Sequence, residues 1–133
     1  MILGIGIDIV DIPKLTAEAF GNRLGDFKSF NFTEGEIRYA ESNPSGDPLS
    51  HLSARWAAKE AFLKALDMTN IDNPPRQTNV DHREIEVVND EQGRPLIRLH
   101  GKIKETSAGQ GVKKISLSLS HHGPSAAAVV ILE

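Results

Sequence analysis

Residues 49–68 read LSHLSARWAAKEAFLKALDM, and this stretch decides the fold of the chain. It is rich in alanine and leucine, which are strong helix formers. At about 100° per residue its apolar side chains fill two arcs, a broad one that includes Ala61 and a smaller one that includes Trp56. A helix that is apolar on most sides is expected to be largely buried. The stretch therefore predicts a long central helix whose charges lie in two narrow stripes.

The charged stripes of this helix hold the first candidate site residues. Arg55 and Lys59 form one stripe, and Glu60 and Lys64 form the other. Glu60 and Lys64 are four residues apart, so an ordinary surface ion pair worth about 0.2–0.5 kcal/mol is one interpretation. The helix offers little solvated surface, however, which favours a functional role. Glu60 is then a candidate metal ligand, and Lys64 a point charge for a phosphate group.

The segment GIGIDIV, residues 4–10, predicts a strand that carries a second carboxylate. Side chains alternate along it, with Ile5, Ile7 and Ile9 on one face and Gly4, Gly6 and Asp8 on the other. We expect the isoleucine face to point into the core. Desolvating Asp8 costs several kcal/mol unless a cation or hydrogen-bond donors replace water, and glycine lets a ligand approach closely. The strand thus indicates a metal or phosphate site, with an exposed strand-end aspartate as the alternative.

Taken together, Asp8 and Glu60 are the predicted metal ligands. Two carboxylates and several waters are the usual way in which proteins hold Mg²⁺, leaving positions open for substrate phosphates. His121 ends an alternating strand where a loop begins, so it is a candidate site residue, or else a histidine bonded to its own turn. The histidines at positions 51, 82 and 100 lie in or beside loops and are expected to be solvated.

The rest of the chain predicts shorter elements around the central helix. Asp11 caps a helix that runs to about Lys28, with a break near Gly21 or Gly25. The remaining elements are a capping box and short helix at 33–41, a loop at 70–82, a hairpin of 85–88 with 96–99, a helix at 101–108, strands at 114–120 and 126–132, and a turn at 121–125 between these two. The fold class is α+β, a small and largely antiparallel sheet packed around a long central helix.

Composition limits the classes of protein that this can be. A chain of 133 residues that is 39% apolar predicts a single domain over residues 1–133. The absence of cysteine excludes disulfides and thiolate metal sites and fits a cytoplasmic location. A net charge of −3 argues against nucleic-acid binding. Neither an apolar run long enough to span a membrane nor a secretory signal is visible, so no membrane partner is expected.

Several segments, in the same order along the chain, resemble one family. These are Gly4–Val10, Phe32–Glu36, the helix Arg55–Ala65 with its W-x-x-K-E-A-x-x-K pattern, Ser118–His121 and Ala126–Val130. In sequence and length the chain is similar to the holo-[acyl-carrier-protein] synthases, which are short single-domain 4′-phosphopantetheinyl transferases.

The resemblance implies a reaction and roles for the candidate residues. Coenzyme A would donate its phosphopantetheine arm to a serine of an apo acyl carrier protein and release adenosine 3′,5′-bisphosphate. Asp8 and Glu60 would hold Mg²⁺ against the coenzyme pyrophosphate, which Lys64 would contact. Ser120 and His121 would line the coenzyme site. The resemblance also implies a homotrimer with active sites between subunits.

The carrier-docking surface departs from the family pattern. The family docks its acidic carrier on a basic first helix, whereas basic residues over 13–28 outnumber acidic ones by only one. Carrier docking is therefore expected to rely on apolar contacts, or on Arg38 and Arg55, and Arg55 is also a candidate coenzyme A contact. Two other functions stay open from the residues, a non-catalytic coenzyme A or carrier-binding module and a metal-dependent phosphohydrolase.

Overall fold

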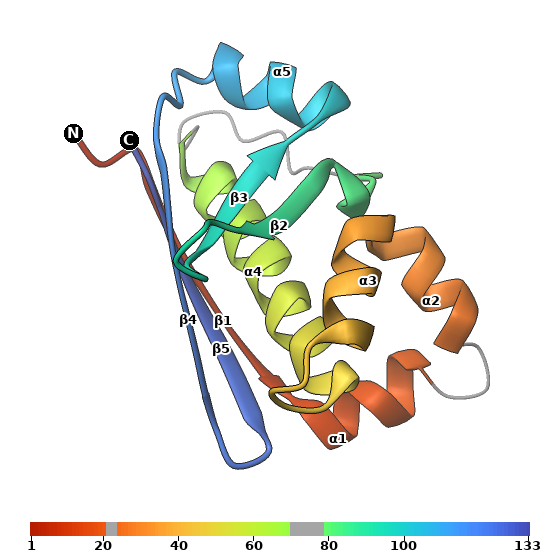
Figure 1. Ribbon diagram of the computed structural model, residues 1–133. Coiled ribbons are helices and arrows are strands. Elements are labelled where there is room, and N and C mark those ends of the chain that lie inside the picture. The colour runs from red at the N-terminus through yellow and green to blue at the C-terminus, as the bar shows by residue number, and fades with distance from the viewer. Residues whose placement is uncertain (21–23, 70–78) are drawn as a thin grey trace.

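The computed structural model describes residues 1–20, 24–69 and 79–133 and is built around one long helix (Figure 1). This helix, α4, covers Pro48–Met68, and its N-cap residue Asp47 accepts a hydrogen bond from the Leu49 backbone N–H at 3.1 Å. Proline in the first turn suits a helix start because no backbone donor is needed there. The predicted central helix is confirmed, and it is buried on most sides.

A three-stranded antiparallel sheet packs against α4. It consists of β1 (Gly4–Asp11), β4 (Ile115–His122) and β5 (Ser125–Leu132) in the order β1-β5-β4. In this register Asp8 lies opposite Ala128, which in turn lies opposite Leu119. The α+β class with antiparallel pairing is therefore confirmed.

The prediction of which face of β1 is buried was wrong. Ile5, Ile7 and Ile9 are 48%, 57% and 69% exposed, and the glycine face packs on α4. A Cβ atom at Gly6 would lie 1.9 Å from the carbonyl oxygen of Ala61, so only glycine permits this approach. The strand backbone itself contacts the helix there, and this contact replaces the expected burial of isoleucine.

The remaining elements flank this pair of layers. The hairpin of β2 (Ile85–Asn89) and β3 (Pro95–Leu99) crosses the upper half of α4 in Figure 1, and α5 (Gly101–Gly109) lies above it. Beside it lie α1 (Ile12–Leu15), a π-helical turn (Thr16–Phe20), α2 (Leu24–Asn31) and α3 (Glu34–Ser42). The predicted hairpin and the predicted helix at 101–108 are confirmed.

Several local predictions can be compared with these elements. Asp11 caps α1 by accepting a hydrogen bond from the Lys14 backbone N–H, and Thr33 and Glu36 form the predicted capping box of α3. The predicted first helical region is present as α1, the π-helical turn and α2. The expected break near Gly21 lies outside the described part of the chain, as do residues 70–78 of the predicted loop. Strands β4 and β5 extend further than expected and leave only Gly123 and Pro124 as the turn. Among the described residues no helix is long and apolar enough to cross a membrane.

Candidate active site

An open pocket of about 280 Å³ lies between the C-terminal half of β1, the start of α1 and the middle of α4. Its lining includes Asp8, Asp11, Lys14, Trp56 and Glu60. The pocket therefore brings together the two carboxylates that the sequence places 52 residues apart (positions 8 and 60). Glu18 also lines the pocket, and Asp11 is held as the cap of α1, so Asp8 and Glu60 are the two lining carboxylates that the strand and the central helix supply.

Asp8 is positioned by the register of β1. The residue belongs to the glycine face, so its side chain lies on the α4 side of the sheet and is only 17% exposed. Lys64 Nζ donates to Asp8 Oδ1 at 3.1 Å and to the Ile7 carbonyl at 3.0 Å. Burial raises the pKa of Asp8, Lys64 partly offsets this, and the nearby charge of Glu60 adds to the increase. Among the described residues, Lys64 is the cation that pairs with this partly desolvated carboxylate.

Glu60 is held by a histidine that the sequence did not single out. His82 Nε2 lies 2.9 Å from Glu60 Oε1, and the imidazole ring stacks on Trp56 at a centroid distance of 4.7 Å. The prediction that His82 is solvated was wrong, because its side chain is 19% exposed. Nothing in the sequence pattern marks this residue, since its partners are on a helix more than 20 residues away. The ordinary pair of Glu60 with Lys64 does not form, because Lys64 binds Asp8 instead.

A buried ion pair anchors the segment that carries His82. Lys59 Nζ donates to Glu36 Oε1 at 2.8 Å and to the carbonyl oxygens of His82 and Ile85 at 2.8 and 2.7 Å. Lys59 and Glu36 are 0% and 1% exposed, and burial lowers the pKa of Lys59. Removing one partner of such a pair typically costs about 3–5 kcal/mol. Lys59 therefore holds α3 and the start of β2 against α4, and it lies at the centre of a network rather than on a solvated stripe.

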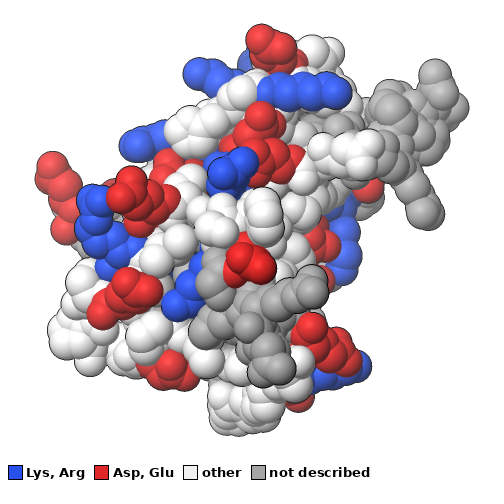
Figure 2. Space-filling view, turned by 90° about the vertical axis from the view of Figure 1, so that its right-hand side faces the viewer, with Lys and Arg blue, Asp and Glu red and all other residues white. Residues whose placement is uncertain are grey.

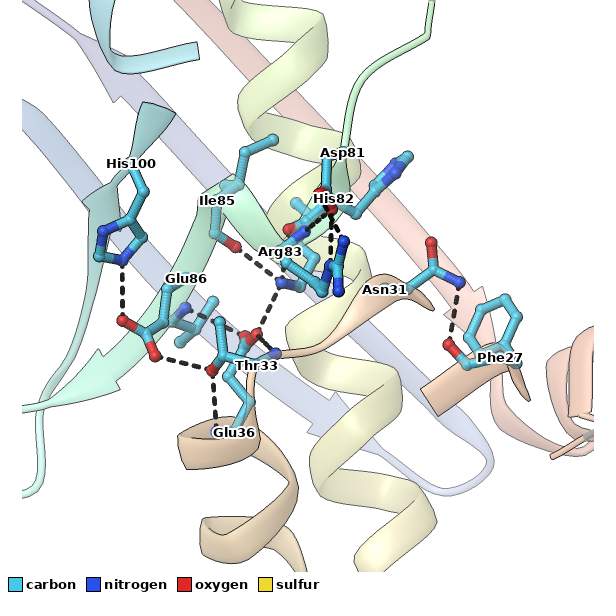
Figure 3. Close-up of polar contacts among 12 residues, drawn as sticks. Phe27, Asn31, Thr33, Glu36, Asp81, His82, Arg83, Ile85, Glu86 and His100 are labelled. Carbon is cyan, nitrogen blue, oxygen red and sulfur yellow. Dashed lines mark hydrogen bonds and ion pairs between the residues drawn. The ribbon is translucent and has the colours of Figure 1, made fainter. Parts of the chain in front are cut away.

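Glu36 connects this pair to further polar groups on both sides. Its second carboxylate oxygen accepts from the Val87 backbone N–H at 3.1 Å. Glu86 Oε2 accepts from the hydroxyl of Thr33 at 2.7 Å, and Glu86 Oε1 lies 3.0 Å from His100 Nε2 (Figure 3). These contacts join the N-terminus of α3, strand β2 and the N-cap residue of α5. His100 was also expected to be solvated, and it is the exposed end of this chain of contacts.

Arg55 lies apart from the pocket. It is 3% exposed, its Nη2 donates to Asn89 Oδ1 at 2.7 Å, and its guanidinium carbon lies 4.1 Å from the centre of the Tyr39 ring. The structure therefore does not bring Arg55 together with Asp8 and Glu60. A guanidinium buried between α3 and β2 is also poorly placed for docking a carrier, whereas Arg38 has a 72% exposed side chain.

Ser120 and His121 lie on β4 and are exposed. His121 is opposite Ala126, which is opposite Val10, so two inter-strand spacings, about 10 Å in total, separate it from β1. Neither residue lines the pocket of Asp8 and Glu60. His121 is also a strand residue rather than part of the turn. Within one chain the structure does not join these residues to the carboxylate pair.

The donor set of the pocket fits a divalent cation that also binds a substrate. Asp8 and Glu60 supply hard oxygen ligands, and burial raises the pKa of Asp8, a desolvation penalty that a bound cation would offset. The described residues contain no group of three or more metal-ligating side chains, so the protein alone does not complete a coordination shell. Mg²⁺ is the cation that accepts one or two carboxylates and leaves positions for phosphate oxygens.

The face that carries α1, α2 and α3 has charges of both signs. Figure 2 shows acidic and basic side chains interspersed across it, without a broad continuous basic area among the coloured residues. This agrees with the small excess of basic residues along the first helical region. The fold and site together define a class, that of small α+β proteins with an acidic pocket between a sheet and its central helix.

Comparisons with known proteins identify the family within this class. A family model described as the 4′-phosphopantetheinyl transferase superfamily matches residues 4–130. Holo-[acyl-carrier-protein] synthases of Mycobacterium bovis and Mycobacterium tuberculosis are 44% identical to this chain over 132 residues, which is 99% of the chain and 97% of each relative. The chain belongs to the 4′-phosphopantetheinyl transferase superfamily.

Solved structures agree with this assignment. An acyl carrier protein synthase from Mycobacterium tuberculosis superimposes with a TM-score of 0.76 at 42% identity and covers 100% of this chain and 98% of its own. A complex of such a synthase with coenzyme A, from Chronobacterium ammoniagenes, has a TM-score of 0.84 at 34% identity and covers 97% and 95% of the two chains. The fold is shared along its full length.

Proposed function

We propose that this chain, acting as one domain, is a holo-[acyl-carrier-protein] synthase. It transfers the 4′-phosphopantetheine group of coenzyme A to a serine of an apo acyl carrier protein and releases adenosine 3′,5′-bisphosphate. The full-length similarity to named synthases supports the reaction. The single structural observation that carries the assignment of the site is the placement of Asp8 and Glu60 in one pocket.

The chemistry requires positioning and charge neutralisation rather than a nucleophile from this chain. The acceptor serine oxygen forms a bond to the phosphorus next to the pantetheine arm, while the bond from that phosphorus to the bisphosphate oxygen breaks. Asp8 and Glu60 would hold Mg²⁺, which when bound stabilises charge on the pyrophosphate. Lys64 lies beside Asp8 and supplies a second positive charge for the departing bisphosphate. The serine proton passes either to Glu60 or to a water, metal-bound or intervening, in the pocket.

We propose that the chain forms a homotrimer, and the exposed outer face of the sheet supports association between copies. In Figure 1 no described helix or strand packs on the side of β1, β5 and β4 opposite α4. This side carries Ile5, Ile7 and Ile9, with Val129 and Ile131 beside them on β5. An exposed apolar area of this kind is typical of an interface between protein chains. Association through the sheets would let Ser120 and His121 of a neighbouring copy contribute to the coenzyme site.

Replacing Ile7 with glutamate should convert the oligomer to a monomer and reduce transfer. Ile7 is 57% exposed at the middle of this face, so the chain should still fold while an interface there would bury an unpaired charge. Sedimentation equilibrium measures the mass. The matched control is Phe30→Glu, which changes a 67% exposed side chain on α2, away from the sheet. A wild-type mass for the Ile7 variant would contradict this interface.

The function is tested by intact mass spectrometry of an apo acyl carrier protein incubated with the enzyme, coenzyme A and Mg²⁺. We expect a gain of one phosphopantetheine group, and its loss when EDTA removes the metal. Coenzyme A binding without any covalent product would support the non-catalytic binding module instead. Release of phosphopantetheine in the absence of a carrier would support the phosphohydrolase. The cytoplasmic location expected from the sequence remains a prediction.

A further inference from the structure

The His82 side chain contacts both a pocket aromatic ring and a pocket carboxylate. Trp56 and Glu60 are four residues apart on α4, so they occupy the same face of the helix and both line the pocket. His82 lies across them, with its ring 4.7 Å from the Trp56 ring at an interplanar angle of 25° and its Nε2 2.9 Å from Glu60 Oε1. An ionised carboxylate can only accept, so the ring donates to Glu60 through Nε2.

The backbone of His82 is fixed as firmly as its ring. Its carbonyl oxygen accepts from Lys59 Nζ at 2.8 Å, and Lys59 is itself buried against Glu36. On the preceding residue, the Asp81 carboxylate accepts from the Arg83 backbone N–H at 3.0 Å and caps the turn His82–Glu84. These contacts place the imidazole before any ligand arrives, which is the condition for a residue that orients another one.

The contact leaves half of the Glu60 carboxylate available. Oε1 is taken by His82, whereas Oε2 has no polar partner within the described ranges. A ligand carboxylate that is hydrogen-bonded through one oxygen has a fixed plane and presents the other oxygen to the metal. Loss of such supporting partners typically weakens metal binding or activity by about 10–100-fold.

We infer that His82 is a positioning residue that orients the Glu60 carboxylate for the divalent cation. The inference rests on the proposed metal site and adds to it the element that aligns one of its two ligands. Trp56 stacks on one face of the imidazole ring, while Nε2 at the ring edge bonds Glu60. The turn at His82–Glu84 and helix α4 thus hold the imidazole in place from both ends of the contact. His82 does not itself contact substrate in this role, and it acts only through Glu60.

The test compares variants that separate the hydrogen bond from the stacking. His82→Phe keeps an aromatic ring on Trp56 and removes the donor, and His82→Gln places an amide N–H at about the reach of Nε2. Binding of Mn²⁺ to the whole protein is followed by the electron paramagnetic resonance signal of the free ion. The Mg²⁺ dependence of transfer is measured in parallel.

We expect His82→Phe to weaken Mn²⁺ binding by about tenfold and to raise the half-saturating Mg²⁺ concentration similarly. The maximal rate should largely recover at high Mg²⁺. A folding defect would instead lower the maximal rate at every Mg²⁺ concentration. His82→Gln should stay within about threefold of wild type, since it restores the donor.

Two results would overturn the inference. One is wild-type Mn²⁺ affinity in His82→Phe, and the other is equal weakening in the Phe and Gln variants, because the hydrogen bond would then not matter. If His82→Phe does not fold, His82→Asn provides the comparison with His82→Gln, because its amide is too short to reach Glu60. Glu60→Ala is measured as well. Unchanged Mn²⁺ binding in that variant would show that the proposed metal site itself is wrong, which differs from a failure of His82 alone.

Discussion

Replacing Asp8 with asparagine should lower phosphopantetheine transfer by about 1,000-fold or more while the fold is retained. The change removes one negative charge from the ligand pair and preserves the shape of the side chain. Metal stabilisation of transition-state charge is worth several kcal/mol, and each 1.36 kcal/mol corresponds to a factor of ten. The measurement is the rate at which holo carrier appears at saturating coenzyme A and Mg²⁺.

A matched control separates metal binding from the general charge of the pocket. Asp11 lies on the same strand and also lines the pocket, but its carboxylate caps α1. Asp11→Asn removes the same charge and keeps a good N-cap residue, so it should retain most of the activity. Equal losses in both variants would contradict the assignment of Asp8 as a metal ligand and would point to a general electrostatic effect.

The Asp8 variant should also be slightly more stable than the wild type at neutral pH. Burial raises the pKa of Asp8 in the folded state above its ordinary value of 3.8. At neutral pH the group is ionised in both states, and its ionisation then lowers the free energy of unfolding. The penalty disappears as pH falls below the ordinary carboxyl value, where both states bind the proton. Urea unfolding midpoints measured from about pH 3.5 to 7 should therefore converge at the acidic end. A wild type that is more stable at pH 7 would show that Lys64 compensates fully.

Replacing Gly6 with alanine should destabilise the protein by about 3 kcal/mol or more, because a packed contact would have to open. The new Cβ would lie 1.9 Å from the Ala61 carbonyl oxygen and 2.8 Å from the Ala65 nitrogen, both of them backbone atoms of a rigid helix. Strand β1 would have to move away from α4. Since Asp8 is on that strand and Glu60 on that helix, the site should be disturbed together with the fold. Urea denaturation with transfer assays on the folded fraction measures both effects.

Gly109→Ala is the appropriate control for the Gly6 substitution. Gly109 is in α5, and no described atom beyond its chain neighbours and its own helix backbone lies within 4 Å of an added Cβ. Alanine in a helix is favoured over glycine by roughly 1 kcal/mol, so this variant should be neutral or slightly more stable. Similar destabilisation in the two variants would mean that the β1–α4 contact is not the cause.

The sequence predicted the main elements because their signals are local. Alanine-rich periodicity located α4, Thr33 and Glu36 located the start of α3, and alternation located the strands. The candidate ligands Asp8 and Glu60 were found as charges in segments that otherwise read as buried. Each of these inferences requires only the chemistry of residues that are neighbours along the chain.

The tertiary structure alone decided which face of β1 is buried and what each charge of α4 does. Alternation shows that β1 has two faces, but the close approach of Gly6 to α4 determines that the isoleucines point outward. The pairing of Lys59 with Glu36, and of Glu60 with His82, likewise depends on segments more than 20 residues apart. Contacts at such separations are set by packing between elements, and the local sequence pattern carries no information about that packing.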